Sequence, residues 1–171
     1  YSWSPDGKWF TLEFTGNRHD PYTDIGIVSA QGGKVVNLTN SGYTSGSPRW
    51  VLDGNAILFI TERYGMRAHA SWGSLNDVML VFMNQDAYDK FRLSKEDYEL
   101  QKELEKEQKS TAEAKKNDKK KGDNKDKPEE KKEEKTKDIV VELDNIEDRI
   151  VRLTPNSSNL GSAIITKNGE T

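Results

Sequence analysis

Strand signals fill the first 83 residues: some segments alternate between apolar and polar residues with the period of two of a half-buried β-strand, and others are short apolar runs bounded by turns. Between positions 9 and 15, Phe10, Leu12 and Phe14 alternate with polar or amphipathic residues. Tight-turn signals such as Asp6-Gly7 and Gly32-Gly33 separate the runs. Further strands are predicted at 24–30, 35–39, 48–51, 56–61, 77–83 and 150–154. The pattern therefore predicts an all-β fold of short strands joined by turns.

These segments also repeat. Trp3-Ser4-Pro5-Asp6-Gly7 is echoed 47 positions later by Trp50-Val51-Leu52-Asp53-Gly54. Val36-Asn37-Leu38-Thr39 is echoed 115 positions later by Val151-Arg152-Leu153-Thr154. A repeat of this length, built around an Asp-Gly turn, is typical of a β-propeller blade. Because the second interval is much longer than the first, one repeat is predicted to carry a large insertion.

The repeats predict a partial β-propeller of about two four-stranded antiparallel blades. The first blade is expected at 1–40, and the second at 46–84 and 149–155. A charged insertion, helical and disordered, is expected at 85–148, within the second blade. A third blade is expected to start at 161–171, with an unfinished strand at 163–166. Both ends of the chain are accordingly interpreted as cuts inside a larger protein.

The insertion divides into two parts by composition. A helix is predicted from Asp86 to about Lys116, with Ser94 and Asp97 in a capping-box pattern. Residues 117–137 are almost entirely Lys, Glu and Asp, so they cannot bury enough apolar surface to fold and are predicted to be disordered. Positive and negative charges are interspersed there without aromatic residues, which argues against a nucleic-acid tail and favours a solvated spacer.

Composition excludes several classes of partner and site. The 171 residues are 33% hydrophobic and 32% charged, with a net charge of −3, which is too small to imply a highly charged partner. With no cysteine, a disulfide framework, a thiolate zinc site and a cysteine nucleophile are excluded. No apolar run approaches the length of about 18 residues that a membrane-spanning helix needs. No cofactor is expected.

A few residues could carry chemistry, but none has a specific motif. His19 and His69 fall in equivalent loops and could suggest a metal site, although surface loop histidines are the better interpretation. Ser45, Ser71 and Ser74 lie in loops without a Gly-x-Ser-x-Gly elbow, so a Ser–His–Asp site is left open without support. No catalytic, cofactor-binding or metal-binding residue is assigned.

The matched tryptophans and aspartates favour structural roles. Trp3, Trp9, Trp50 and Trp72 could form an aromatic ligand surface. Trp3 and Trp50 occupy equivalent repeat positions, however, which favours packing between neighbouring blades. Asp24 and Asp77 are also matched, and are expected to bond loop amides where the third strand begins.

Two stretches resemble known families. Ser4-Pro5-Asp6-Gly7-Lys8, followed by Asp24-Ile25 and by Val36-Asn37-Leu38-Thr39, resembles the propeller repeat of tricorn proteases and of the Tol-system periplasmic propeller protein. Residues 141–153, with Ile146-Glu147-Asp148-Arg149 at their centre, are similar to a segment of tricorn-like proteases. This resemblance implies a large serine peptidase whose propellers precede a PDZ module and a tail-processing-type catalytic domain. The catalytic motifs of that family do not occur here, so no catalytic residue is carried over.

The leading hypothesis is therefore a propeller fragment of a tricorn-like serine peptidase, periplasmic or exported, which is not catalytic by itself and gates or recognises peptide substrates. Two alternatives stay open: a Tol-type periplasmic protein-binding scaffold, and the propeller of a prolyl-oligopeptidase-like enzyme. Whether the parent is an active enzyme is left open. The expected partners are peptide or protein substrates of the parent and further copies of this chain. Self-association is expected through incompletely covered apolar faces carrying Phe10, Leu12, Phe14, Ile57, Phe59 and Val81.

Overall fold

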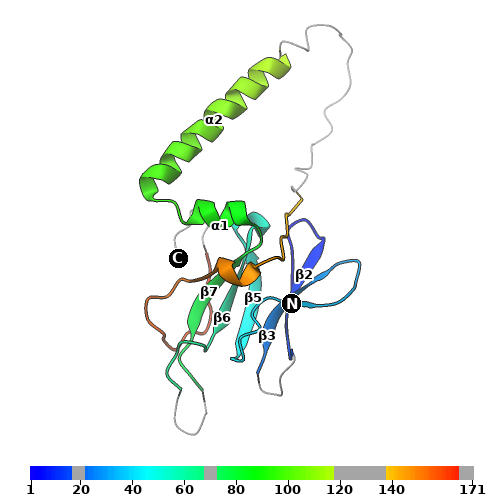
Figure 1. Ribbon diagram of the computed structural model, residues 1–171, viewed down its shortest axis with the longest axis vertical. Helices are drawn as coiled ribbons and strands as arrows, with labels where there is room; N and C mark the ends of the chain where they lie inside the picture. The colour runs from blue at the N-terminus through cyan, green and yellow to red at the C-terminus, as the bar shows by residue number, and fades with distance from the viewer. Residues whose placement is uncertain (17–21, 68–72, 118–137, 166–171) are drawn as a thin grey trace. The chain divides into compact units, whose positions relative to one another are not determined.

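The computed structural model describes residues 1–16, 22–67, 73–117 and 138–165, which contain two four-stranded antiparallel sheets (Figure 1). The first sheet comprises β1 (Ser2–Trp3), β2 (Trp9–Phe14), β3 (Asp24–Ser29) and β4 (Val36–Asn37). The second comprises β5 (Ser45–Val51), β6 (Ala56–Thr61), β7 (Asp77–Phe82) and β8 (Ile150–Arg152). Each sheet follows chain order, so the prediction of a mostly-β fold with two four-stranded antiparallel sheets is confirmed.

The two sheets share one hydrogen-bonding register. Trp3 lies opposite Phe10 in the first sheet, as Trp50 lies opposite Ile57 in the second. At the other edge, Val36 lies opposite Ile27, and its sequence match Val151 lies opposite Leu80. Register determines which side chains share a face of a sheet. Matched residues of the two repeats therefore occupy the same face in their respective sheets.

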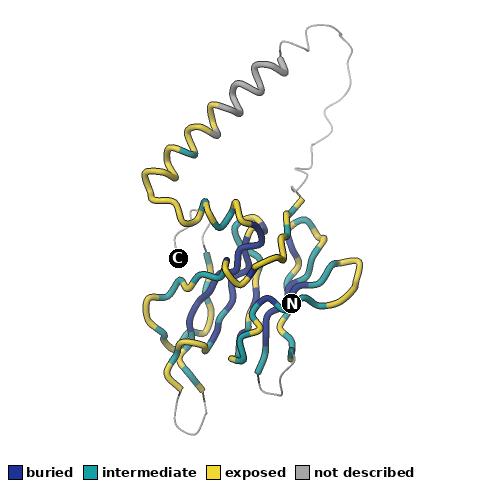
Figure 2. Tube along the Cα trace, in the orientation of Figure 1, coloured by how far each residue is buried: buried dark blue, intermediate teal, exposed yellow. Residues whose placement is uncertain are grey.

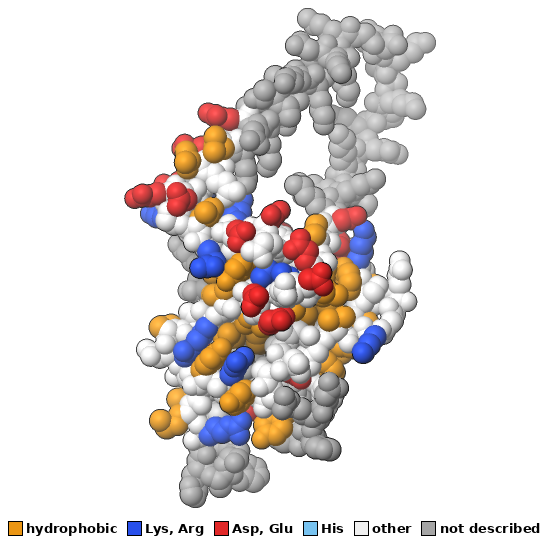
Figure 3. Space-filling view, viewed as in Figure 1, with side chains coloured by type: hydrophobic (Ala, Val, Ile, Leu, Met, Phe, Trp, Pro, Cys, Tyr) orange, Lys and Arg blue, Asp and Glu red, His pale blue; other side chains and the backbone are white. Residues whose placement is uncertain are grey.

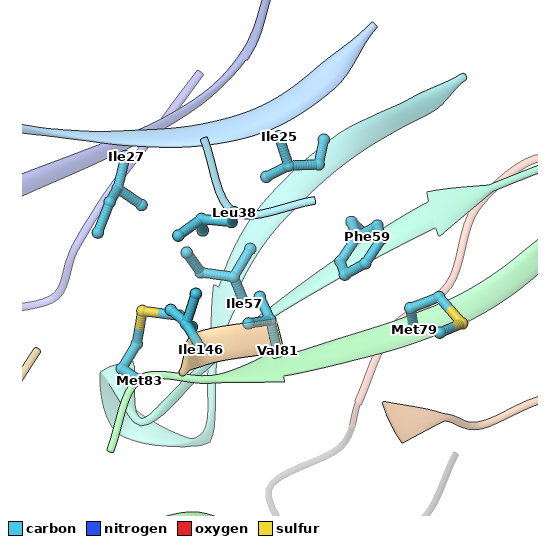
Figure 4. Packing of buried hydrophobic residues seen from close by; sticks show 9 residues of the cluster. All are labelled: Ile25, Ile27, Leu38, Ile57, Phe59, Met79, Val81, Met83 and Ile146. Carbon is cyan, nitrogen blue, oxygen red and sulfur yellow. The ribbon is translucent and has the colours of Figure 1, made fainter. Parts of the chain in front are cut away.

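A hydrophobic core lies between the two sheets (Figure 4). Ile25 and Ile27 of β3, and Leu38 beyond β4, face the second sheet and are at most 2% exposed. The second sheet contributes alternate residues of β6 and β7 to the same cluster: Ile57, Phe59, Met79 and Val81. Burying one such side chain fully contributes about 1.5–3 kcal/mol, so this layer holds the sheets together.

The other face of the second sheet is also covered. Leu58, Val78 and Leu80 are buried there, and Ala87, Tyr88, Leu153, Leu160, Ala163 and Ile165 pack against this cluster. Coverage on both faces explains why β7 is apolar almost throughout instead of alternating. The strand predicted at 163–166 is not formed in its described part, 163–165, because no other strand pairs with it. These residues instead pack as an irregular segment against the sheet.

Residues 138–149, at the end of the predicted insertion, pack against both sheets. The backbone N–H of Ile139 donates to the carboxylate of Asp6 at 2.9 Å, and that of Glu142 donates to the Met83 carbonyl at 2.8 Å. Ile146 opens the short 3-10 turn η4 (Ile146–Arg149) and enters the core between the sheets. The buried guanidinium of Arg149 donates to three backbone carbonyls, those of Phe82, Glu142 and Asp144. The end of the region predicted as insertion is thus tied to the sheets.

The predicted helix is two helices, α1 (Gln85–Phe91) and α2 (Lys95–Asn117). The break falls before Ser94, whose hydroxyl oxygen accepts the Asp97 backbone N–H at 3.1 Å and donates to the Asp97 carboxylate. By contacts the chain forms two compact units, residues 1–88 with 136–171, and residues 89–135. The described side chains of α2 are mostly exposed (Figure 2). The predicted disorder at 117–137 falls, beyond Asn117, outside the described residues.

The matched turn glycines provide a test of the packing at 138–149. Both have positive φ, +70° at Gly7 and +88° at Gly54, so alanine strains either turn by about 1 kcal/mol. A Cβ on Gly7 would contact nothing within 4 Å, whereas one on Gly54 would lie 2.7 Å from Cγ1 of Ile139. Gly54→Ala is therefore expected to destabilise the chain by about 2 kcal/mol and Gly7→Ala by about half of that, measured by urea unfolding.

Ile139→Ala supplies the control for this pair. In the Ile139→Ala background most of the extra cost of Gly54→Ala is expected to vanish, because the clashing Ile139 atoms are gone, although Cδ of Pro5, at 3.3 Å, stays close to the new Cβ. Equal losses for Gly7→Ala and Gly54→Ala in the parent chain would mean that Ile139 does not pack on this turn.

Candidate functional site

One end of the sheets gathers loops from both repeats. In an antiparallel sheet of consecutive strands, the second strand ends at the same edge where the third begins, and the fourth strand ends there too. The loops after β2, β4, β6 and β8 therefore emerge together, at the lower end in Figure 1. We call this the strand-end surface, and it carries most of the polar side chains that the sequence singled out.

Asp24 connects two segments of the first repeat at this end through hydrogen bonds. Its side chain is 4% exposed, and its carboxylate accepts hydrogen bonds from the Thr39 hydroxyl at 2.7 Å and the Asn37 amide at 2.9 Å. The backbone N–H of Ser41 adds a third bond at 3.3 Å. Asp24 thus joins the start of β3 to the chain leaving β4.

Asp77 connects the equivalent segments of the second repeat, and its donors include a charged guanidinium. Its buried carboxylate accepts from the hydroxyls of Thr154 and Ser157, each at 2.7 Å, and from the Arg152 guanidinium at 2.8 and 3.0 Å. Burial alone would raise the pKa of Asp77, but the hydrogen bonds from Thr154, Ser157 and Arg152 and the charge of Arg152 outweigh burial and lower the pKa.

These two aspartates differ from the sequence expectation in one respect. Loop amides were expected as donors, whereas hydroxyl, side-chain amide and guanidinium groups dominate, and one backbone amide contributes at Asp24. The Thr of the repeated Leu-Thr pair has the same role in both sheets, since the hydroxyls of Thr39 and Thr154 donate to Asp24 and Asp77. A carboxylate occupied in this way serves the structure and is a poor general base.

Two of the candidate serines, Ser45 and Ser74, donate hydrogen bonds to other side chains. Ser45 is buried and donates to the Thr61 hydroxyl at 3.0 Å. Ser74 donates a short hydrogen bond to the Glu62 carboxylate, which also accepts the Thr44 backbone N–H at 3.3 Å. Burial would raise the pKa of Glu62, but these hydrogen bonds and the charge of Arg67 lower the pKa instead.

Four candidate residues from the sequence analysis fall in segments that the structure does not describe. His19, His69, Ser71 and Trp72 lie outside the described residues. Among the residues that are described, no group of three or more His, Asp or Glu side chains could hold a metal ion. No helix in the described part of the chain is long and apolar enough to cross a membrane.

The matched tryptophans have different surroundings. Trp50 packs against the core cluster between the sheets, as does Trp9. Trp3 lies on the outer face of the first sheet, where it contacts Phe10 with ring centroids 3.5 Å apart and stays 51% exposed. Packing between neighbouring repeats is thus seen for Trp50 and not for Trp3.

Arginine and tyrosine side chains meet on the strand-end surface, which sequence reasoning missed. The Arg67 guanidinium lies over the rings of Tyr22 and Tyr43, with its carbon 5.9 and 5.7 Å from their centroids. Arg63 and Arg152 lie 5.5 and 5.1 Å from the centroid of Tyr64. Figure 3 shows hydrophobic and basic side chains together at this end of the molecule. These residues come from separate loops, so no motif of adjacent residues points to them.

A shallow hollow is found elsewhere on the second sheet. It has a volume of about 350 Å³ and is lined mainly by apolar side chains, among them Leu58, Val78, Pro155 and Ile164. The segment at 163–165 forms one wall, so the hollow belongs to the packing of that segment on the sheet. None of its described lining residues is charged, so none of them would orient a ligand by charge.

Comparison with known proteins gives a peptidase relation over part of the chain. A stretch of 56 residues is 39% identical to the "Uncharacterized peptidase YuxL" of Bacillus subtilis (strain 168). The match covers 33% of this chain and 8% of the length of that relative. No protein-family model matches the chain, and no solved structure matches it significantly. The similarity supports a relation to peptidases and does not distinguish among peptidase families.

Proposed function

We propose that this chain is part of a β-propeller in a peptidase-related protein, not catalytic by itself, where it recognises or gates peptide substrates. The observation that carries the proposal is the shared register of the two sheets. Identical register places equivalent residues on equivalent faces, which is what repeated blades require.

The faces of the sheets support blade-on-blade stacking. Ile57 and Val81 of the second sheet face the first sheet and are fully buried. The equivalent residues of the first sheet, Phe10 and Val28, face away from the second sheet and are only half-buried. Each sheet thus has an equivalent apolar face. In the second sheet this face packs on the first sheet, and in the first sheet it would pack on a preceding blade.

The peptidase assignment rests on the comparison and on the sequence resemblance together. The tricorn-like segment at 141–153 includes Arg149, which ties that segment to the sheets, so the resemblance concerns residues with a structural role. The similarity to a peptidase favours an enzyme parent over a Tol-type scaffold. A periplasmic or exported location and a tricorn-like parent remain part of this proposal, with a prolyl-oligopeptidase-like parent as the alternative.

Sequencing the parent gene beyond Thr171 tests the assignment. A PDZ module followed by a tail-processing peptidase core supports the tricorn-like proposal. An α/β-hydrolase domain with a nucleophile elbow supports the prolyl-oligopeptidase-like alternative. An open reading frame that ends without an enzyme domain contradicts both and favours a binding scaffold.

The outer face of the first sheet predicts self-association of this chain. Phe10, Leu12 and Phe14 line it, half-buried, beside the exposed Trp3. Ile57, Phe59 and Val81, which were expected to be incompletely covered as well, are instead buried between the sheets. Light scattering at micromolar concentration is expected to show a dimer or larger species.

Matched variants locate the contact. Leu12→Lys, on this face, is expected to give a monomer, whereas Val140→Lys, at an exposed site elsewhere, is expected to leave the mass unchanged. A monomeric state of the chain without substitutions would contradict the prediction.

A further inference from the structure

We propose that the Tyr–Arg surface, formed by Tyr22, Tyr43, Arg63, Tyr64 and Arg67, binds acidic peptide segments through their Asp and Glu side-chain carboxylates. The residues lie at the strand-end surface, on the loops after β2, β4 and β6. The inference stands on the contacts of these side chains and does not depend on the chain being part of a propeller.

The arginines of this surface are exposed and available. Within the described part of the chain, neither Arg63 nor Arg67 forms an ion pair, whereas Arg152 is engaged with the buried Asp77. Glu62 is the acidic neighbour of Arg67, but its oxygens accept the Ser74 hydroxyl and the Thr44 N–H. Two guanidinium groups are therefore left to face solvent.

Tyrosine rings hold these guanidinium groups in place. Arg67 lies over the rings of Tyr22 and Tyr43. Arg63 lies over Tyr64. A guanidinium held beside a ring still has an N–H edge that can donate to a ligand, and its restricted motion reduces the side-chain entropy lost on binding.

The chemistry of this edge fits carboxylates. A guanidinium presents parallel N–H groups that match the two oxygens of a carboxylate, and such charge-assisted pairs are stronger than neutral hydrogen bonds. Tyr43 and Tyr64 are 37% and 48% exposed, and Met66 beside them is 80% exposed. Aromatic and Met side chains next to Arg are the composition of protein-binding surfaces.

The same observations disfavour a nucleic acid as the partner. Affinity for a phosphate backbone grows with the number of cations that contact it. Here the two arginines that form no ion pair with a described residue lie in one loop of a chain whose net charge is −3. A short acidic peptide matches the size and charge of this surface better.

Fluorescence anisotropy with end-blocked, labelled peptides tests the proposal on the full chain. A Glu-rich peptide is expected to bind, and the same peptide with every Glu replaced by Gln is expected not to. Blocking both ends removes the terminal carboxylate, so binding reports side-chain carboxylates alone. Arg67→Gln is expected to weaken binding about tenfold, and Arg67→Lys to restore only part of it.

Lys34→Gln is the matched control. It removes one exposed positive charge from the turn between β3 and β4, at the opposite end of the first sheet, and is expected to leave the affinity unchanged. Equal weakening by Lys34→Gln and Arg67→Gln would overturn the proposal, as would equal binding of the Gln peptide. Tighter binding of a single-stranded oligonucleotide than of the Glu peptide would overturn it in favour of nucleic acid. Thermal melts establish that each variant is folded.

Discussion

Replacing Asp77 with alanine is expected to lower the free energy of unfolding by about 3 kcal/mol or more, measured by urea denaturation. The substitution removes an acceptor shared by Arg152, Thr154 and Ser157. The three donors are only partly buried, so water can replace part of each lost bond, but hydrogen bonds to a charged group contribute about 1.5–3 kcal/mol each. The loss is large because one side chain joins β7 to both β8 and the loop that follows it.

Asp24→Ala is the comparison that isolates the contribution of charge. Asp24 occupies the matched position, but its donors are the neutral groups of Thr39, Asn37 and Ser41. Its loss is expected to be smaller, about 1–3 kcal/mol. Asp148→Ala, at an exposed position, is expected to change stability little. A loss at Asp24 equal to that at Asp77 would show that the Arg152 ion pair adds nothing.

The lowered pKa of Asp77 gives this prediction a pH dependence. A carboxylate whose pKa is lower in the folded state contributes stability at pH values above its unfolded pKa of about 3.9. That contribution is lost as the pH falls through the lower, folded pKa. The stability difference between the parent chain and Asp77→Asn is therefore expected to be full near neutral pH and to shrink below about pH 4.

Trp50→Ala is expected to destabilise the chain by about 3 kcal/mol, the lower end of the range for a core tryptophan, because Trp50 is partly buried. Trp50 packs against the cluster between the sheets, so alanine would leave a cavity there. Its indole nitrogen is buried without a hydrogen-bond partner among the described residues. Trp50→Phe, which keeps most of the packing and loses no hydrogen bond, is therefore expected to cost much less.

Trp3→Ala is the internal control, because Trp3 occupies the same position in the first repeat. It is half exposed and contacts Phe10, so its loss is expected to be about 1 kcal/mol. Thermal melts of the three variants under identical buffer conditions make the comparison. Similar losses for Trp3→Ala and Trp50→Ala would contradict the placement of Trp50 between the sheets.

The local pattern of this sequence determined its strands, its repeat and its helix cap. Alternation predicts a strand because side chains on a pleated strand point to opposite faces, and this located β2, whereas short apolar runs between turn signals located β3, β6 and β7. The match of Val36-Asn37-Leu38-Thr39 to Val151-Arg152-Leu153-Thr154 located β8 across the long insertion. Ser94 predicted a helix start, although not that a separate helix would precede it.

Only the tertiary structure decided what surrounds each element. Trp3 and Trp50 occupy matched repeat positions, yet Trp3 is half exposed and Trp50 packs against the core cluster, because burial depends on the neighbouring sheet. The donors that Asp77 binds lie more than 70 positions away, and the members of the Tyr–Arg surface come from separate loops. Sequence proximity carries no information on such contacts, since chain folding brings these residues together.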